Sequence, residues 1–88
     1  MAVLIDEPIW PNHGTVWGHL VSDTSLDELH AFARAAGIPA RGFDNDHYDY
    51  PLHRREALIA QGATPVTGRE LLRRLQAAGL RVRQIDKT

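Results

Sequence analysis

Residues 44–49 (DNDHYD) place three carboxylates and one imidazole within six positions. Carboxylate oxygens suit Mg²⁺ or Mn²⁺, and an added imidazole shifts the preference of a site toward manganese, iron or zinc. The segment is not an EF-hand calcium loop, because it has no glycine at the sixth position and no acidic residue at the twelfth. We expect a divalent metal (Mg²⁺, Mn²⁺ or Zn²⁺) to be held by four residues: Asp6, Asp46, His47 and Asp49. The alternative is that these acids only form turns and cap helices.

A second set of polar residues supplies candidates for catalysis. An imidazole titrates near neutral pH, so His19 or His47 could be a metal ligand or a general base. His19 could equally be bonded to a loop carbonyl without a catalytic role. Arg54 follows the acidic segment and could neutralise a negatively charged substrate, or merely pair with a nearby acid. Asp23 is a further candidate. The candidate catalytic residues are therefore His19, Asp23, His47 and Arg54.

Two tryptophans, Trp10 and Trp17, lie in one segment, and each buries a large area wherever it packs. In a small domain the simplest role for them is to complete the hydrophobic core. The alternative is an aromatic wall that holds a ligand and excludes water from a charged site. Trp10 and Trp17 are therefore the candidate ligand-binding residues outside the charged set.

Composition excludes several classes of function. The chain has no cysteine, so it has no disulfide, no thiolate metal site and no cysteine nucleophile. The GxGxxG, P-loop, GxSxG and HExxH patterns are all absent. The net charge is −1, with a net of −6 over residues 1–50 and of +5 over residues 51–88, and this asymmetry is compatible with a homo-oligomer. The basic half lacks interleaved aromatic residues, so we do not expect nucleic acid binding.

Helices are predicted at three places by capping signals and apolar spacing. A capping box over residues 25–28 (SLDE) opens a helix whose apolar residues repeat until Gly37. A second box over residues 67–70 (TGRE) opens a helix that ends at Gly79. Between them, residues 51–62 begin with a proline, which suits the first position of a helix.

Short apolar runs predict the strands. A proline confines the run at residues 63–66 to a sheet edge or a strand end. Residues 7–23 contain two prolines and two glycines without a sustained period, so they predict a long loop with a short regular piece at residues 15–21. Residues 44–50 are polar and typical of turns. Strands are predicted over residues 2–5, 40–43, 63–66 and 80–83.

This order of elements predicts a small α/β domain in which a mostly parallel sheet of three to four short strands is packed by three helices. The chain forms a single domain over residues 1–88, with residues 85–88 as a frayed tail. Ligands of parallel sheets bind beyond the carboxyl ends of the strands. Asp6 ends the first predicted strand and His47 follows the second, so we expect the candidate residues to meet at one rim of the molecule.

Several strings in the chain resemble those of a known family. They are W-P-x-H-G at residues 10–14, His19-Leu20, Ser22-Asp23, SLDELHAFA at residues 25–33 and D-H-Y-D at residues 46–49. From residue 2 to about residue 80, the chain resembles the short bacterial and phage proteins grouped as domain of unknown function family 4031. The resemblance implies that these polar and aromatic residues belong to the family's signature, and it implies no particular activity. Tyr50 stands where the family pattern has an aliphatic residue.

These observations predict a metal-dependent hydrolase of a small molecule, such as a phosphate-containing ester, with its Asp/His site at the strand ends. The alternative is a non-catalytic binding or adaptor module that uses the Trp/His loop and the acidic rim to hold a partner protein or a small ligand. The first ten residues have no basic n-region, and their apolar run is too short for a membrane anchor. We therefore expect a cytoplasmic protein that does not bind membranes.

Overall fold

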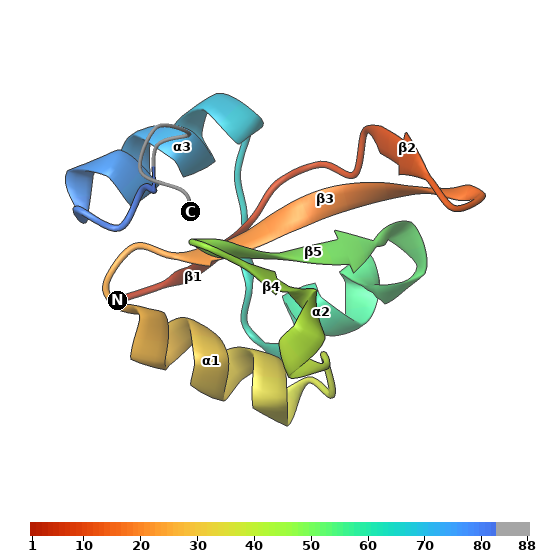
Figure 1. Cartoon of the computed structure of the whole chain (residues 1–88), viewed down its shortest axis with the longest axis horizontal. Coiled ribbons are helices and arrows are strands. Elements are labelled where there is room, and N and C mark those ends of the chain that lie inside the picture. Colours follow the sequence, from red (N-terminus) through yellow and green to blue (C-terminus); the bar gives the residue numbers. More distant parts are fainter. Residues whose placement is uncertain (83–88) are drawn as a thin grey trace.

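Six strands form a mixed sheet at the centre of the protein (Figure 1). The computed structural model describes residues 1–82. The strands are β1 (Val3–Ile5), β2 (Trp10–Asn12), β3 (Thr15–Ser22), β4 (Phe43–Asp44), β5 (His47–Pro51) and β6 (Thr64–Pro65). They lie in the order β4-β5-β3-β1-β6, with β2 paired to β3 beside this path. The β1–β6 pair is parallel and the other pairs are antiparallel, so the prediction of a mostly parallel sheet of three to four strands is wrong.

Three α-helices pack on this sheet, which confirms the α/β class: α1 (Leu26–Ala35), α2 (Arg55–Gln61) and α3 (Gly68–Ala77). Both capping boxes mark helix starts as predicted, because Ser25 accepts the N–H of Glu28, and Thr67 that of Glu70, each at 3.1 Å. In the first box, the Glu28 side chain does not accept the reciprocal hydrogen bond from the N–H of Ser25. The Glu28 carboxylate accepts a hydrogen bond from the hydroxyl of Ser22 at 2.5 Å, and so ties α1 to the end of β3.

One face of the sheet carries the larger hydrophobic core. The side chains of Leu20, Tyr48 and Tyr50 alternate along β3 and β5 with residues of the opposite face, and they are buried together with Val3 and Ile5 of β1. Leucines of α1 and α2 cover them. Figure 1 shows these two helices on the same side of the sheet.

The opposite face is only partly covered. There Leu4 of β1 and Val21 of β3 pack against Leu71 and Leu75 of α3, in a smaller core. The helix lies on the other side of the sheet from α1 and α2 (Figure 1). The part of this face next to that core is occupied by polar side chains of β3 and β5, described below.

Residues 7–23, predicted as a long loop, contain the β2–β3 hairpin. Its two turn residues, His13 (φ +48°) and Gly14 (φ +77°), both have the positive φ that a type I′ turn requires. The regular piece predicted at residues 15–21 is confirmed as β3. The sequence of β2 does not alternate between apolar and polar residues, because all three of its residues are exposed.

Residues 40–50 also differ from the prediction. The predicted strand at residues 40–43 is a 3₁₀ helix (Ala40–Gly42) followed by the first residue of β4, and the predicted turn segment contains β5. In β5, Tyr48 and Tyr50 are buried while His47 and Asp49 alternate with them. The alternation of strand residues is present in the sequence, but the polar residues of the alternation are also typical of turns.

The remaining elements largely follow the predictions. The predicted helix at residues 51–62 is a 3₁₀ helix (Leu52–Arg54) followed by α2, and Pro51 is the last residue of β5 instead of the first helical residue. The strand β6 lies at an edge of the sheet. Residues 80–82 are not a strand, and the rest of that predicted strand, like the predicted tail at residues 85–88, lies outside the described residues. Within residues 1–82, no helix has the length and apolar character needed to cross a membrane.

Candidate metal centre

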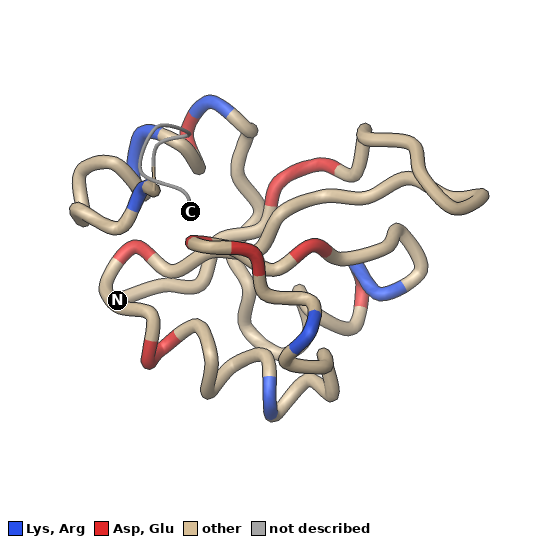
Figure 2. Tube along the Cα trace, in the orientation of Figure 1, with Lys and Arg blue, Asp and Glu red and all other residues tan. Residues whose placement is uncertain are grey.

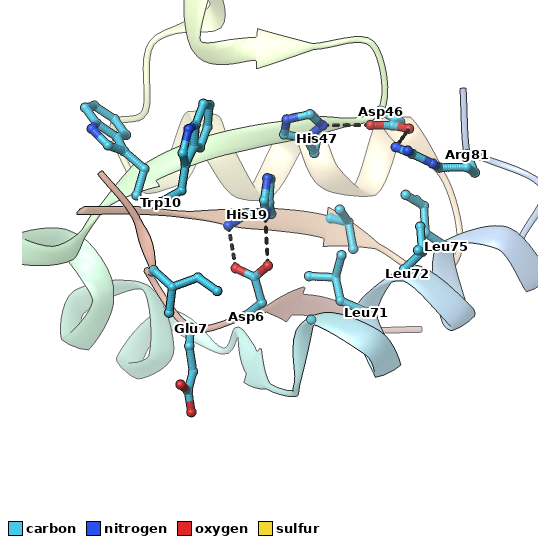
Figure 3. A pocket seen from close by; sticks show the side chains of 14 residues that line it. Asp6, Glu7, Trp10, His19, Asp46, His47, Leu71, Leu72, Leu75 and Arg81 are labelled. Carbon is cyan, nitrogen blue, oxygen red and sulfur yellow. Dashed lines mark hydrogen bonds and ion pairs between the residues drawn. The ribbon is translucent and has the colours of Figure 1, made fainter. Parts of the chain in front are cut away.

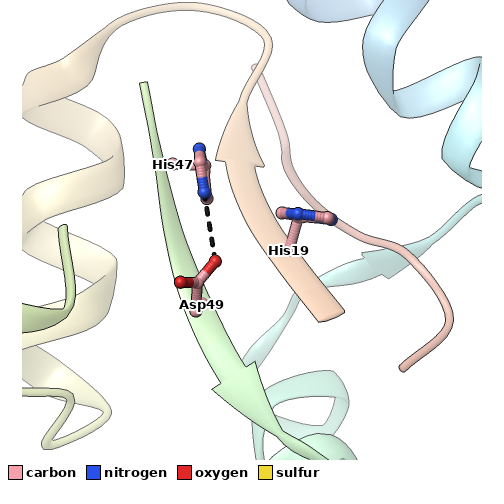
Figure 4. Close-up of side chains that lie close together, drawn as sticks. All are labelled: His19, His47 and Asp49. Carbon is pink, nitrogen blue, oxygen red and sulfur yellow. Dashed lines mark ion pairs between the residues drawn. The ribbon is translucent and has the colours of Figure 1, made fainter. Parts of the chain in front are cut away.

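The register between β3 and β5 brings the polar candidates together on one face of the sheet. His19 pairs directly with Asp49 across the two strands, and His47 lies two residues before Asp49 on the same face. The rings of His19 and His47 meet edge to face, with centroids 4.9 Å apart. Figure 4 shows the three side chains close together on neighbouring strands. They meet because alternate residues share a face, and not at the carboxyl ends of parallel strands as predicted.

Asp6 directly follows β1 and fixes His19 from the neighbouring strand. Its Oδ2 lies 2.8 Å from Nδ1 of His19, and its Oδ1 accepts the backbone N–H of His19 at 2.6 Å. Both oxygens of the Asp6 carboxylate thus contact His19. The remaining ring nitrogen of His19, Nε2, is turned toward His47 (Figure 3).

Asp46 holds the second histidine in the same way. Its Oδ1 lies 2.7 Å from Nδ1 of His47, while its Oδ2 accepts the N–H of Val82 at 2.9 Å and a guanidinium N–H of Arg81 at 3.2 Å. Asp46 is buried. A carboxylate on Nδ1 is the usual device that orients a metal-binding histidine and leaves Nε2 for the ion.

His19, His47 and Asp49 each offer one ligand atom, and these three atoms lie within 4.8 Å of one another. Nε2 of His47 is 3.1 Å from Oδ1 of Asp49, an ion-pair distance without hydrogen-bond geometry. This buried oxygen accepts no hydrogen bond from any described residue. An unsatisfied buried carboxylate oxygen is unfavourable, and a cation between these three groups would satisfy it.

Charges around His47 favour a cation at this place. Burial would lower the pKa of the His47 imidazole, but the neighbouring carboxylates of Asp49 and Asp46 outweigh burial and raise the pKa above its ordinary value of 6.5. Burial would raise the pKa of Asp46, but hydrogen bonds from His47 and Val82 and the charges of His47 and Arg81 lower it. The site therefore attracts a proton that a metal ion would replace.

Gly18 allows Asp6 to approach β3. A Cβ atom on Gly18 would lie 2.6 Å from the ring of Tyr50 and 2.8 Å from Oδ1 of Asp6. The Tyr50 hydroxyl donates to the backbone carbonyl of Asp6 at 2.5 Å, and Arg55 donates to the same carbonyl and, at 2.7 Å, to that hydroxyl. Sequence reasoning missed this support. The available signal was a glycine inside a strand, which often marks a close backbone or ligand approach.

A pocket of about 350 Å³ lies over the histidines, between the sheet and α3 (Figure 3). Trp10 and Trp17 both line it, and the ring of Trp10 lies nearly parallel to that of His19, with centroids 6.0 Å apart. Both tryptophans are thus part of a pocket wall, and neither belongs to the two buried cores. Arg81, which sequence reasoning missed, also lines the pocket.

Two predicted site residues lie elsewhere. Asp23 accepts hydrogen bonds from Arg74 of α3 and, at 2.8 Å, from the N–H of Ala2. Burial would raise the pKa of Asp23, but these hydrogen bonds and the Arg74 charge lower it. Arg54 donates to the carbonyl of Ala36 at the end of α1. Both side chains connect elements of the fold, and their hydrogen bonds go to residues outside the cluster, although Arg54 lines a second pocket together with Asp49.

The charge asymmetry of the sequence is also visible in the fold. Figure 2 shows acidic positions near the centre of the molecule and also on α1 and α3, and basic positions on α3 and on outer segments. The ion pairs Asp23–Arg74 and Asp46–Arg81 join acidic residues of the first half to basic residues of the second. The two halves of the chain therefore attract each other within one molecule.

A comparison with known families identifies the chain. Residues 3–78 match the family model described as Protein of unknown function (DUF4031). The match covers most of the chain, so the protein belongs to this family, as its sequence strings indicated. No curated protein and no solved structure matches it significantly.

Proposed function

We propose that this member of the DUF4031 family binds one divalent metal ion through His19, His47 and Asp49 and uses it in hydrolysis. The proposal rests mainly on the buried Oδ1 of Asp49, which accepts no hydrogen bond of regular geometry from the described residues, lies 3.1 Å from Nε2 of His47, and belongs to one cluster with His47 and His19. Such an oxygen is rare in folded proteins unless an ion or water satisfies it.

The donor set favours some metals over others. Two imidazoles and one carboxylate suit zinc, iron or manganese better than magnesium, which prefers oxygen ligands. Two histidines with one acidic residue are also a common ligand set of catalytic zinc, which keeps one further position for water or substrate. We therefore propose zinc or manganese in place of magnesium.

Asp6 and Asp46, which the sequence predicted as ligands, take a different role in this proposal. Each already holds Nδ1 of a histidine, so we propose that they orient His19 and His47 and raise their basicity as ligands. Both histidines then serve as ligands, and neither is the general base that the sequence also allowed.

A metal ion held in this way would activate a water molecule for attack on a polarised substrate bond. The pocket beside the ligands supplies the space for a small substrate, and its tryptophan wall limits the access of bulk water. Neither Asp23 nor Arg54 has a place in this reaction, because both are bound to other parts of the fold. We further propose that the protein acts in the cytoplasm.

Calorimetric titration of the metal-free protein with zinc chloride tests the metal site. We expect binding of one equivalent, and His19→Ala and Asp49→Asn should each weaken it by about tenfold or more. His53→Ala and Asp44→Asn are matched controls, because both residues are exposed and neither belongs to the cluster. Unchanged affinity in His19→Ala and Asp49→Asn would contradict the proposal.

Hydrolysis is tested separately with a series of activated esters, amides and phosphate esters. The zinc-loaded protein should hydrolyse at least one compound faster than the metal-free protein does, and Asp49→Asn should remove the difference. If zinc-loaded, metal-free and Asp49→Asn protein give equal rates on the whole series, the proposed hydrolysis is refuted and only the metal site stands.

A non-catalytic binding role is the second candidate, and one observation favours it. The β2–β3 hairpin projects from the body of the molecule (Figure 1), and all three residues of β2 are exposed, including Trp10. An exposed aromatic hairpin is a suitable contact surface for a partner protein or a second copy of the chain. In that case, removing Trp10 would abolish partner binding whether or not metal is bound.

A further inference from the structure

Large apolar side chains gather at the mouth of the pocket. Ile9, Trp10 and Leu72 are exposed by 78 %, 44 % and 39 %, and all three line this pocket. They come from two segments: Ile9 and Trp10 are adjacent at the start of β2, and Leu72 lies on α3. Exposed large apolar residues that surround a polar floor are typical of a ligand-binding site.

The inner wall continues this apolar surface toward the histidines. Trp17 and Val21 of β3 and Leu71 and Leu75 of α3 line the same pocket. A ligand group held by a metal at His19 and His47 would therefore have hydrocarbon on several sides. The pocket volume of about 350 Å³ suits a molecule with one ring or a short chain, at the small end of ligand pockets.

The charges of the pocket disfavour a strongly anionic ligand. Asp6 and Asp46 line it, whereas the carboxylate of Glu7 points away from the histidines (Figure 3), and the guanidinium of Arg81, which also lines it, is already bonded to Asp46. A divalent ion on Asp49 would add only about one net positive charge. A phosphate dianion in this pocket would thus meet the carboxylates of Asp6 and Asp46 and little positive charge to offset them.

We propose that the substrate of this site is a small, uncharged acyl compound, an ester or amide, whose apolar or aromatic group packs on the wall formed by Trp10 and Leu72. The proposal rests on the metal site proposed above and makes it more specific. It replaces the phosphate ester considered from the sequence with an acyl group, because an acyl carbonyl brings no charge to the carboxylates around the pocket.

Two metal-binding probes of different apolar size test this proposal. Acetohydroxamate and benzohydroxamate carry the same metal-binding head, on a methyl and on a phenyl group. With zinc-loaded protein, benzohydroxamate should bind at least about tenfold more tightly, because its ring buries more apolar surface. Inorganic phosphate and phenylphosphonate should both bind more weakly than benzohydroxamate.

Variants locate the effect on the proposed wall. Trp10→Ala and Leu72→Ala should each reduce benzohydroxamate affinity by about fivefold and leave acetohydroxamate and zinc affinity within about twofold. Leu52→Ala is the matched control for Leu72→Ala, because Leu52 is also exposed but does not line this pocket. It should leave the affinity for both hydroxamates unchanged.

The outcomes separate the two proposals. If neither zinc nor manganese binds, both proposals fail. If zinc binds and the two hydroxamates bind equally, or Trp10→Ala and Leu72→Ala change nothing, the metal site stands and the apolar substrate is refuted. Tighter binding of phenylphosphonate than of benzohydroxamate would refute the uncharged substrate in the same way.

Discussion

The two faces of the β3–β5 pair differ in chemical character, and alternate residues of the same two strands form them. On the face beneath α1 and α2, Leu20 and Tyr50 are completely buried among hydrocarbon side chains. On the other face, His19 lines a pocket, and Asp49 is its partner across the two strands. A chain of 88 residues can bury only a small core. Because alternate residues of a strand point to opposite faces of the sheet, β3 and β5 supply core residues on one face and polar residues for a site on the other.

The largest effect is expected on the buried face. Leu20→Ala removes a completely buried side chain beneath α1 and α2 and should lower the free energy of unfolding by about 2–5 kcal/mol. Urea unfolding of the metal-free protein measures this loss. Where the variant remains folded, its zinc affinity should be close to that of the wild type. A loss smaller than about 1 kcal/mol would show that this face does not dominate stability.

The polar face should respond to substitution in the opposite way. At a pH above the raised pKa of His47, Asp49→Asn should change the unfolding free energy of the metal-free protein by less than about 1 kcal/mol, because the ion pair with a protonated His47 is then absent and Oδ1 of Asp49 accepts no hydrogen bond among the described residues. In zinc at a hundredfold excess over the dissociation constant, the wild type should gain about 2.7 kcal/mol and the variant much less. Thermal unfolding with and without zinc measures both quantities. A strongly destabilised metal-free variant would mean that Asp49 has a structural role.

Gly18 connects the two faces and should affect both. In Gly18→Ala the new methyl group would press on the Tyr50 ring on one side and on the Asp6 carboxylate on the other. We expect a loss of about 1–3 kcal/mol of stability from overpacking, together with weaker zinc binding because His19 loses its orientation. Urea unfolding and zinc titration of the same preparation measure the two effects. Normal zinc affinity would show that Asp6 does not position His19 for a metal.

The smallest effect is a pH dependence that should differ between metal-free and zinc-loaded protein. Since the folded-state pKa of His47 is raised above its ordinary value, its protonation stabilises the metal-free fold below that ordinary value, and this stabilisation is lost as pH rises through the raised pKa. Zinc competes with the same proton, so stabilisation by zinc should increase with pH over that interval. Urea unfolding at several pH values between about 5 and 8 measures both trends. Parallel trends with and without zinc would contradict a role for His47 as a ligand.

Sequence reasoning predicted the helices of this fold better than the strands, for a local reason. The capping boxes at Ser25 and Thr67 operate within one turn, so their consequences can be derived from adjacent residues. The strand β5 could not be derived in this way. His47 and Asp49 resemble turn residues, and only pairing with β3 shows that Tyr48 and Tyr50 between them are core.

The composition of the site was predicted more accurately than its geometry. The sequence correctly indicated that Asp6, His19 and His47 come together, but it predicted strand ends of a parallel sheet where the structure has one face of an antiparallel pair. Some carboxylates orient the histidines and another faces the ion. Which does which depends on which carboxylate oxygen lies next to which imidazole nitrogen. That information exists only in the folded chain, as does the role of Gly18.

X-ray absorption at the zinc edge of the zinc-loaded protein would identify the ligands of the ion. We expect a four-coordinate ion with two imidazole nitrogens at about 2.0–2.1 Å and oxygen at a similar distance, and the loss of one imidazole in His19→Ala. A spectrum with fewer than two imidazoles in the wild type, or one unchanged by His19→Ala, would contradict the proposed metal site.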